Sequence, residues 1–321
     1  EVLTTDISPE LGTRLTENLA VGAGLDMQWS RVKFNQMIGA PTLFGTLLGD
    51  DPAMVDSLSY NKASSWGVGY HVGVMGIFND NHTRIGLNYQ SSVRHVFYGH
   101  SRLTGILANN NLPLLGPLPP PGVWQNDDLF SNPQQFPDVL TLSGYQDVNE
   151  RFALLGSVVY TGWALFKTIQ LNNVVVPNIT DTNIGPVVTE ANINTSVPQN
   201  FHDAFRVAVG ANYHATPTVM LRVGGGYDQT PTNDTDRNVR LPDVSRWAIA
   251  FGAHYQWRPN VGVDLGYTHI FAAHRPNIDS TQILSPTSSY NVDVDGGNFK
   301  ADLVGAQLTW IIDKTPEVST K

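Results

Sequence analysis

Apolar and polar residues alternate at every second position along much of this chain. The clearest stretch is residues 19–30, where small or polar residues separate the apolar positions Leu19, Val21, Ala23, Leu25, Met27 and Trp29. A two-residue period puts alternate side chains on opposite faces of a strand, whereas a helix would spread them around its circumference. The pattern therefore predicts a β-strand with one apolar face and one small or polar face.

The same period recurs along the chain and predicts about eleven strands. We expect them near residues 2–14, 18–34, 64–78, 83–100, 136–147, 151–170, 201–214, 218–228, 244–257, 261–275 and 298–312. Short polar connections lie at 16–18, 79–82, 147–150, 215–217 and 258–260. Long connections alternate with them, at 35–63, 101–135, 171–200, 229–243 and 276–297. Outer-membrane barrels have this order of short periplasmic turns and long extracellular loops.

A soluble β-sandwich also has alternating strands, but it does not explain the regular order of short and long connections. Its packed face also needs bulk, whereas Gly67, Gly69 and Gly73 share one strand face and Gly224 and Gly226 share another. Aromatic residues near strand ends suit the girdles of a barrel: Trp29, Trp66, Tyr89, Trp163, Tyr213, Trp247, Trp257 and Trp310. We predict an all-β, antiparallel transmembrane β-barrel over residues 1–312 and a polar tail at 313–321.

The composition narrows the function classes. Charged residues make up 15% of the 321 residues, against about 25% in soluble domains, and the net charge is -9 without a basic tract, so no nucleic-acid partner is expected. The absence of cysteine excludes disulfides and thiolate chemistry. No cofactor or metal is expected, because no closely spaced ligand set lies on one strand face. The start of the chain lacks a signal-peptide pattern, so we expect a mature, truncated or partial chain.

Several stretches resemble the long-chain fatty-acid transporters of Gram-negative outer membranes, of the FadL/TodX type. They are ISPELGTRLTENLAVGAGLDMQWSRVKF, SSWGVGYHVGVMGIFNDNHTRIGLNYQSSVRH, FPDVLTLSGYQDVNERFALLGSVVYTGWALF, FHDAFRVAVGANY and NVRLPDVSRWAIAFGAHYQW. The most specific is R-x-P-D-x-x-R-W, at Arg240, Pro242, Asp243, Arg246 and Trp247. The resemblance covers most of the chain and implies porters for fatty acids, aromatic hydrocarbons or other hydrophobic molecules.

The same resemblance implies a fourteen-stranded barrel with an N-terminal hatch, which this chain does not contain. An odd strand count with an open first edge would also leave backbone groups unsatisfied in lipid. We therefore expect that about eleven of the fourteen strands are present and that the N-terminal strands and the hatch are missing. The resemblance further implies a C-terminal aromatic residue, whereas here DKTPEVSTK follows the last strand.

Two long loops are rich in large apolar residues, as a hydrophobic capture surface requires. In the resembling family these loops form an external groove. The candidate contacts are Phe44, Leu47, Leu48, Ile106, Leu107, Leu112, Leu114 and Leu115. The alternative is that these side chains pack against each other and cap the barrel.

Strand parity predicts inward-facing polar residues at Asp26, Arg84, Asn88, Arg94, Arg206, Arg222, His254 and Asp264. A guanidinium can hold a carboxylate through two hydrogen bonds, so basic residues are candidate ligand contacts. The candidates are Arg31, Lys33, Arg206, Arg240 and Arg246. The alternative is that these charges pair with neighbours, such as Asp203 with Arg206 and Asp243 with Arg246.

The function expected from these features is passive uptake of fatty acids or other hydrophobic small molecules through a gated, monomeric barrel in the bacterial outer membrane. Its partners would be the hydrophobic substrate, outer-membrane lipid and lipopolysaccharide. A general diffusion porin is the first alternative, although a porin favours a charged eyelet. A barrel protease or phospholipase is a weaker alternative, because none of the histidines lies in a recognisable nucleophile motif. The chain is therefore not expected to be an enzyme.

Overall fold

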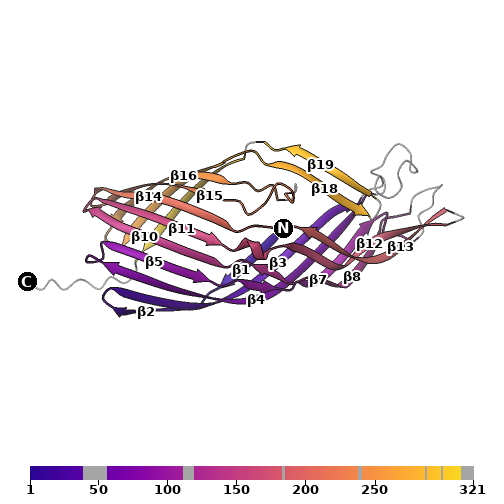
Figure 1. Ribbon diagram of the computed structural model, residues 1–321, viewed down its shortest axis with the longest axis horizontal. Coiled ribbons are helices and arrows are strands. Elements are labelled where there is room, and N and C mark those ends of the chain that lie inside the picture. The colour runs from indigo at the N-terminus through magenta and orange to yellow at the C-terminus, as the bar shows by residue number, and fades with distance from the viewer. Residues whose placement is uncertain are drawn as a thin grey trace, which may run out of the picture.

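The computed structural model describes residues 1–38, 56–110, 119–182, 185–237, 241–285, 288–297 and 299–311. The described chain is built almost entirely from antiparallel β-strands, with one 3-10 helix at Trp163–Leu165. The strands run obliquely along the long axis of a curved sheet (Figure 1). No helix in the described chain has the length and apolar character needed to cross a membrane.

Among the described strands, eleven positions across the sheet form the barrel wall, and the first is shared by β1 and β2, which both pair with β3. The wall strands are β1 (Val2–Ile7), β2 (Glu10–Thr16), β3 (Leu19–Ile38), β4 (Ser57–Phe78), β5 (Thr83–Gln90), β10 (Val139–Asn149), β11 (Phe152–Thr161), β14 (Ala204–Thr216), β15 (Val219–Asp228), β16 (Arg246–Arg258), β17 (Val261–Ala272) and β20 (Lys300–Trp310). The predicted all-β antiparallel wall is confirmed. The predicted tail, 313–321, lies outside the described residues.

Short turns join the wall strands at one end, as predicted. The turn between β4 and β5 holds Asn79, Asp80 and Asn81 with φ of 50°, 51° and 73°. Asn and Asp tolerate this left-handed conformation better than other residues that carry a Cβ. The β4 and β5 ladder then starts at Phe78 and Thr83. Local turn chemistry thus fixes the register of the hairpin.

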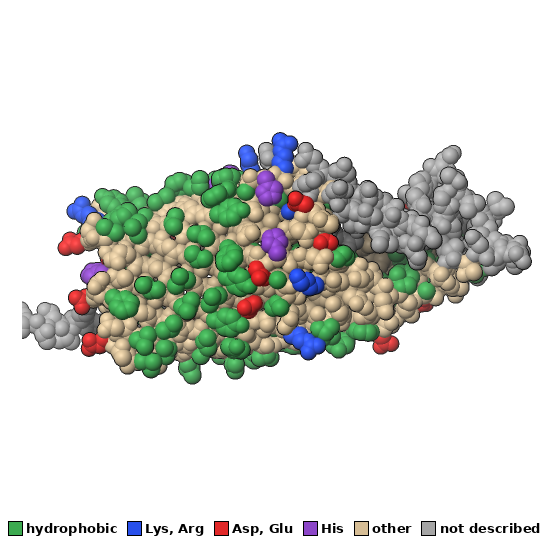
Figure 2. Space-filling view, in the orientation of Figure 1, with side chains coloured by type: hydrophobic (Ala, Val, Ile, Leu, Met, Phe, Trp, Pro, Cys, Tyr) green, Lys and Arg blue, Asp and Glu red, His purple; other side chains and the backbone are tan. Residues whose placement is uncertain are grey.

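The two faces of the wall differ as the alternation predicts. On the outward face, the exposed fractions are 66% for Trp66, 68% for Val68 and 67% for Val209. Hydrophobic side chains spread over this face in Figure 2, while charged and histidine side chains gather at one end and in a band across the middle. An apolar belt with polar borders is the surface that a barrel presents to a bilayer.

One predicted strand is interrupted. The expected strand at 83–100 ends as β5 at Gln90, continues as the short β6 (Val93–His95), and returns to the wall edge as β7 (Tyr98–Gly105). β6 pairs with β9 (Gln134–Phe136) and lies against the inner face of β4, where Gly67 and Gly69 have no side chains to exclude it. The prediction of one continuous strand was wrong because the space for β6 is set by glycines on another strand.

The predicted long connections hold more structure than expected. β3 and β4 extend to Ile38 and Ser57, which shortens the 35–63 connection. The other long connections contain β7, β8 (Gly122–Ser131), β12 (Thr168–Thr182), β13 (Gly185–Pro198), β18 (Asn277–Ser285) and β19 (Ser288–Asp295). β7, β8, β12 and β13 continue the wall sheet beside the Ser57–Ser64 part of β4, at the right of Figure 1.

Two buried apolar clusters stabilise this projecting end. The first joins Leu103, Leu107 and Ala108 to Val175 and Val188. The second joins the wall residues Val32 and Ala63 to Phe97, Leu129, Leu171 and Val174. Val174 and Val175 belong to β12, so this strand packs against the inner faces of β3, β4 and β7. The long connections therefore fold over the wall as a packed cap.

Candidate functional site

Mostly small side chains line the inner face of the wall near the short turns, a part that we call the lower wall. The register brings inward-facing residues of five strands into a row: Arg14, Ala20, Met75, Gly86 and Ser143. The next row toward the projecting end is Gly12, Gly22, Gly73, Asn88 and Thr141. A packed protein interior would fill this space with large apolar residues. These rows leave an open inner surface instead.

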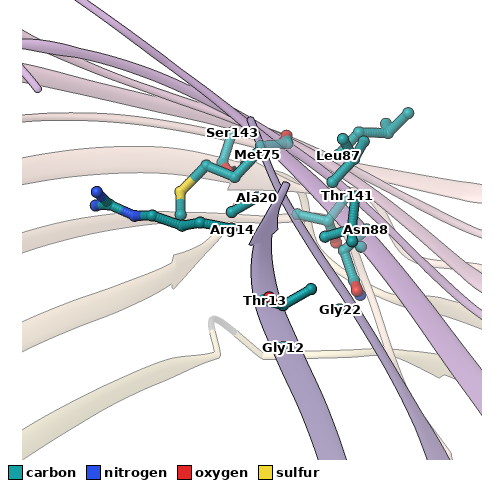
Figure 3. A pocket seen from close by; sticks show the side chains of 14 residues that line it. Gly12, Thr13, Arg14, Ala20, Gly22, Met75, Leu87, Asn88, Thr141 and Ser143 are labelled. Carbon is teal, nitrogen blue, oxygen red and sulfur yellow. Dashed lines mark hydrogen bonds between the residues drawn. The ribbon is translucent and has the colours of Figure 1, made fainter. Parts of the chain in front are cut away.

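A hollow of about 480 Å³ lies over these rows. In Figure 3 the side chains of Arg14 and Met75 extend along one side of the hollow, and Asn88 lies on the other. The guanidinium of Arg14 has no hydrogen-bond or ion-pair partner among the described residues. The inward-facing lining combines glycine and apolar surface with one cation, two hydroxyls and an amide, which is the kind of lining that receives a mostly apolar ligand.

A polar network closes the hollow on its upper side. Asp26 is only 1% exposed, and its Oδ1 lies 2.9 Å from Nδ1 of His71. The Nε2 of His71 lies 3.3 Å from Oε2 of Glu10, while Gln90 donates to Asp26 at 3.4 Å. A buried carboxylate is stable only when paired and hydrogen-bonded, so these contacts explain how Asp26 stays inside the wall.

A second network lies on the opposite part of the wall. Asp264 accepts from Arg222 at 2.9 Å and contacts Nδ1 of His254 at 3.0 Å, and Nε2 of His254 faces Gln256 at 3.2 Å. Neither His254 nor His71 has a hydroxyl at its second nitrogen, which faces an amide in one case and a carboxylate in the other. The His71–Asp26 and His254–Asp264 pairs thus lack the nucleophile that an acyl-transfer site needs.

The predicted basic contacts divide into paired residues, one lumen residue and one undescribed residue. Arg31 and Lys33 form ion pairs with Glu1 at 2.8 and 3.0 Å. Both lie on the outward face of β3, together with Trp29. Arg246 contacts Asp228 at 2.7 Å and Asp243 at 2.9 Å, so the alternative of local pairing describes it. Arg240 lies outside the described residues.

Arg206 faces the lumen in register with Asp228, as its parity predicts. Asp203 was expected to pair with Arg206, but it makes other contacts. Its carboxylate accepts the backbone N–H of Ala164 at 2.9 Å and the hydroxyl of Tyr160 at 2.8 Å. These two donors hold the pKa of Asp203 below its ordinary value, because they stabilise the ionised form.

The predicted apolar contacts are partly described. Leu107 is fully buried and Ile106 packs beside it, so these two belong to the cap. The remaining candidates, Phe44, Leu47, Leu48, Leu112, Leu114 and Leu115, lie outside the described residues. An external groove at those positions stays a prediction.

A second hollow, which we call the wall cleft, lies on the outward side of β4. It has a volume of about 520 Å³ and is lined by Ser64, Ser65, Trp66, Arg94, Val96 and Tyr98. The prediction that Arg94 faces the lumen was wrong, because the chain leaves the wall after Gln90 and the strand parity no longer applies to β6.

Neither hollow was predicted from the sequence. The lower hollow depends on which glycines face each other across strands, and Gly12, Gly22 and Gly73 are consecutive cross-strand neighbours. Glycine on alternate positions of several strands was the available signal, but its meaning depends on the register. Among the described residues, no group of three or more His, Asp or Glu side chains could hold a metal ion.

Comparison with known proteins links this geometry to a family. Residues 1–310 match the family model described as outer membrane protein transport protein (OMPP1/FadL/TodX). The 47 kDa outer membrane protein of Pasteurella multocida is 28% identical over 66% of this chain and 45% of its own length. The long-chain fatty acid transport protein of Escherichia coli K12 is 24% identical over 80% of this chain and 57% of its own length. The chain thus spans about half the length of these relatives.

Solved structures share the fold. A FadL homologue of Pseudomonas aeruginosa superposes with a TM-score of 0.72 at 20% identity, covering 96% of this chain and 67% of that chain. The toluene transporter TbuX of Ralstonia pickettii superposes with a TM-score of 0.57 at 17% identity, covering 96% and 68%. Both likenesses concern the fold, which is that of an outer-membrane β-barrel.

Proposed function

We propose, because this chain belongs to the outer membrane protein transport family (OMPP1/FadL/TodX), that the whole protein carries hydrophobic small molecules across the outer membrane by passive diffusion. The family and the named relatives place the chain in the bacterial outer membrane, as predicted from the sequence. Because the chain covers about half of those relatives, the proposal concerns the complete protein.

The observation that carries the proposal is the small-residue lining of the lower wall. Gly12, Gly22 and Gly73 present backbone and no side chains to the hollow, with Met75 beside them. Transfer of an apolar molecule from water to such a surface lowers its free energy, by roughly 25 cal/mol per Å² of apolar area buried. The surface supports passage without chemical change, since neither His71 nor His254, the two histidines of the inner networks, faces a hydroxyl nucleophile.

Arg14 bears on the substrate class. It is the cation of the hollow, and a guanidinium without a described partner favours a carboxylate ligand. Relatives named for fatty acids and for toluene make both substrate classes reasonable. We propose that the hollow receives the carboxylate end of a fatty acid, with a neutral aromatic hydrocarbon as the competing substrate.

Uptake of labelled oleate and labelled toluene by cells that produce the complete protein tests both statements. Arg14→Gln is expected to lower oleate uptake about tenfold, because a charge-assisted contact is lost, and to leave toluene uptake unchanged. Arg84→Gln, on a neighbouring inward position outside the hollow, is the matched control. Equal oleate uptake in all three proteins would remove the fatty-acid assignment, and absence of any hydrophobe uptake would remove the transport proposal. Large steady conductance of the complete protein in planar bilayers would favour a porin.

A further inference from the structure

The hydrogen-bond ladder of the barrel wall is interrupted along one edge of β4, near the middle of that strand. Along one edge, β4 pairs with β5 from His71 to Phe78 and with β7 from Ser57 to Ser64. Residues 65–69 have no strand partner on that edge among the described strands. The wall therefore contains a gap about five residues long, which at roughly 3.3 Å per residue measures about 17 Å.

Backbone donors point into this gap. Tyr70, at its lower border, uses both its N–H and its C=O toward this edge, in hydrogen bonds of 2.9 and 2.8 Å with Ser91. Residues two apart in a strand direct their backbone groups to the same edge. The N–H groups of Trp66 and Val68 are therefore directed into the gap, where no described strand accepts them.

The wall cleft sits at this gap and carries a positive charge. Ser64 and Tyr98 contribute hydroxyl donors, Trp66 contributes its indole N–H, and Arg94 contributes the guanidinium, while the Ser65 hydroxyl already donates to the carbonyl oxygen of Trp66. Among the described residues that line the cleft there is no carboxylate, and the guanidinium of Arg94 has no hydrogen-bond or ion-pair partner in the described part of the chain. A site with one unpaired cation and several donors is complementary to an anion.

The cleft faces lipid and not the lumen. Val93 and His95 lie behind it against Gly67, and the ring of His95 stacks with Phe97 at 5.5 Å and packs on Phe136 at 4.7 Å. This inner layer separates the gap from the lower hollow. Trp66 and Tyr98 flank the cleft with 66% and 65% of their surface exposed, and such amphipathic rings concentrate where the hydrocarbon meets the lipid head groups.

We propose that the wall cleft binds the phosphate-bearing head of an outer-leaflet lipid, with its anionic oxygens on Arg94 and on the N–H groups of Trp66 and Val68. Backbone groups left unsatisfied in a bilayer are strongly unfavourable, so the gap requires a polar occupant. The exposed apolar face of Trp66, Val68 and Tyr70 then receives the acyl chain below the head. This site is separate from the proposed transport route, because β6 lies between the two.

Native mass spectrometry of the complete protein, titrated with bisphosphorylated lipid A, with the same lipid after dephosphorylation and with oleate, tests the proposal. Arg94→Gln is expected to weaken lipid A binding about tenfold, since hydrogen bonds to a charged group are lost. Arg94→Lys keeps the charge and is expected to retain most of the binding. Arg151→Gln makes the same charge change at the opposite end of the barrel and is expected to change nothing.

The proposal is overturned if Arg94→Gln binds lipid A like the unchanged protein, or if Arg151→Gln loses as much. It is also overturned if the dephosphorylated lipid binds as tightly as lipid A, or if Arg94→Lys loses as much as Arg94→Gln. Displacement of lipid A by oleate, dependent on Arg94, would assign the cleft to a carboxylate amphiphile instead. Oleate uptake is measured separately with Arg14→Gln, so failure of the lipid site and failure of transport are distinguishable.

Discussion

The two halves of the wall are made from the same alternating strands but are paired differently. From β14 to β20, each strand runs beside its neighbours along nearly its whole length, with register shifts only near the turns. In the first half, one edge of β4 is divided between β5 and β7, and the chain between them turns inward. The regular half forms a continuous surface, while the divided half forms the cap, the buried network and the wall cleft.

Glycine has opposite roles at different places in the wall. Around Gly266 and Gly305 no atom lies within contact distance of an added Cβ, so these glycines leave space empty. At Gly67 an added Cβ would meet Val93, His95 and the carbonyl oxygen of Arg94, the last at 2.9 Å. The same residue type thus widens the lumen at Gly266 and Gly305 and admits a second layer of backbone at Gly67.

The largest expected effect comes from closing the space at Gly67. Gly67→Ala is expected to lower the free energy of unfolding by about 3 kcal/mol, because a backbone oxygen and two side chains must move. Guanidinium unfolding of the complete protein in lipid vesicles measures the change. Gly305→Ala is the matched control and is expected to change stability by less than about 0.5 kcal/mol. Equal effects at the two positions would show that the halves do not differ in packing.

A smaller difference is expected between the two histidine–aspartate networks. Asp26→Ala removes a buried acceptor from His71 and Gln90 and is expected to lower stability by about 2 kcal/mol. Asp264→Ala removes a partner of Arg222, which is 42% exposed, so the expected loss is below about 1 kcal/mol. The same unfolding assay compares them. A larger loss for Asp264→Ala would reverse the ranking that burial predicts.

The smallest effect concerns Asp203, beside the start of β14 and outside the strands. Its pKa is lowered in the folded protein by the N–H of Ala164 and the hydroxyl of Tyr160, so ionised Asp203 stabilises the fold. That contribution is present above the ordinary Asp pKa of about 4 and is lost as the pH falls through the lower folded value. Unfolding at pH 7 and pH 3 measures it.

We expect Asp203→Asn to be less stable than the unchanged protein at pH 7 and to approach it at pH 3. A stability difference that stays constant between the two pH values would mean that ionisation of Asp203 does not contribute. Thr235→Ala, a nearby uncharged change, is the control for general effects at this rim and should show no pH dependence in its difference.

The wall strands of the regular half could be predicted almost completely from the sequence, although the β18–β19 hairpin between β17 and β20 could not. The alternation at Trp247, Ile249 and Phe251 fixes the face of β16, and the short turn before Val261 fixes its pairing with β17. Here each residue's environment depends on its own strand and its nearest neighbours. Period and turn chemistry carry that information.

The divided half could be predicted only in part, because its structure depends on distant residues. The strand pattern continues through Val93 and His95, and only the absence of side chains at Gly67 and Gly69 allows this segment to lie inside the wall. Leu107 is a similar case, since its partners Val175 and Val188 lie in a hairpin whose polar sequence resembled a loop. The alternation gave no information on either contact.

The lengths of β3 and β4 have a consequence for the cell surface. These strands have 20 and 22 residues, whereas a strand crosses a bilayer with about ten. At roughly 3.3 Å per residue, the remaining residues of these strands extend about 35 Å beyond the hydrocarbon. An approaching molecule, an antibody or a phage tail therefore meets this projecting end of the sheet before it meets the lipid heads. Sequence changes in the projecting end can alter what is recognised without altering the part held in the bilayer.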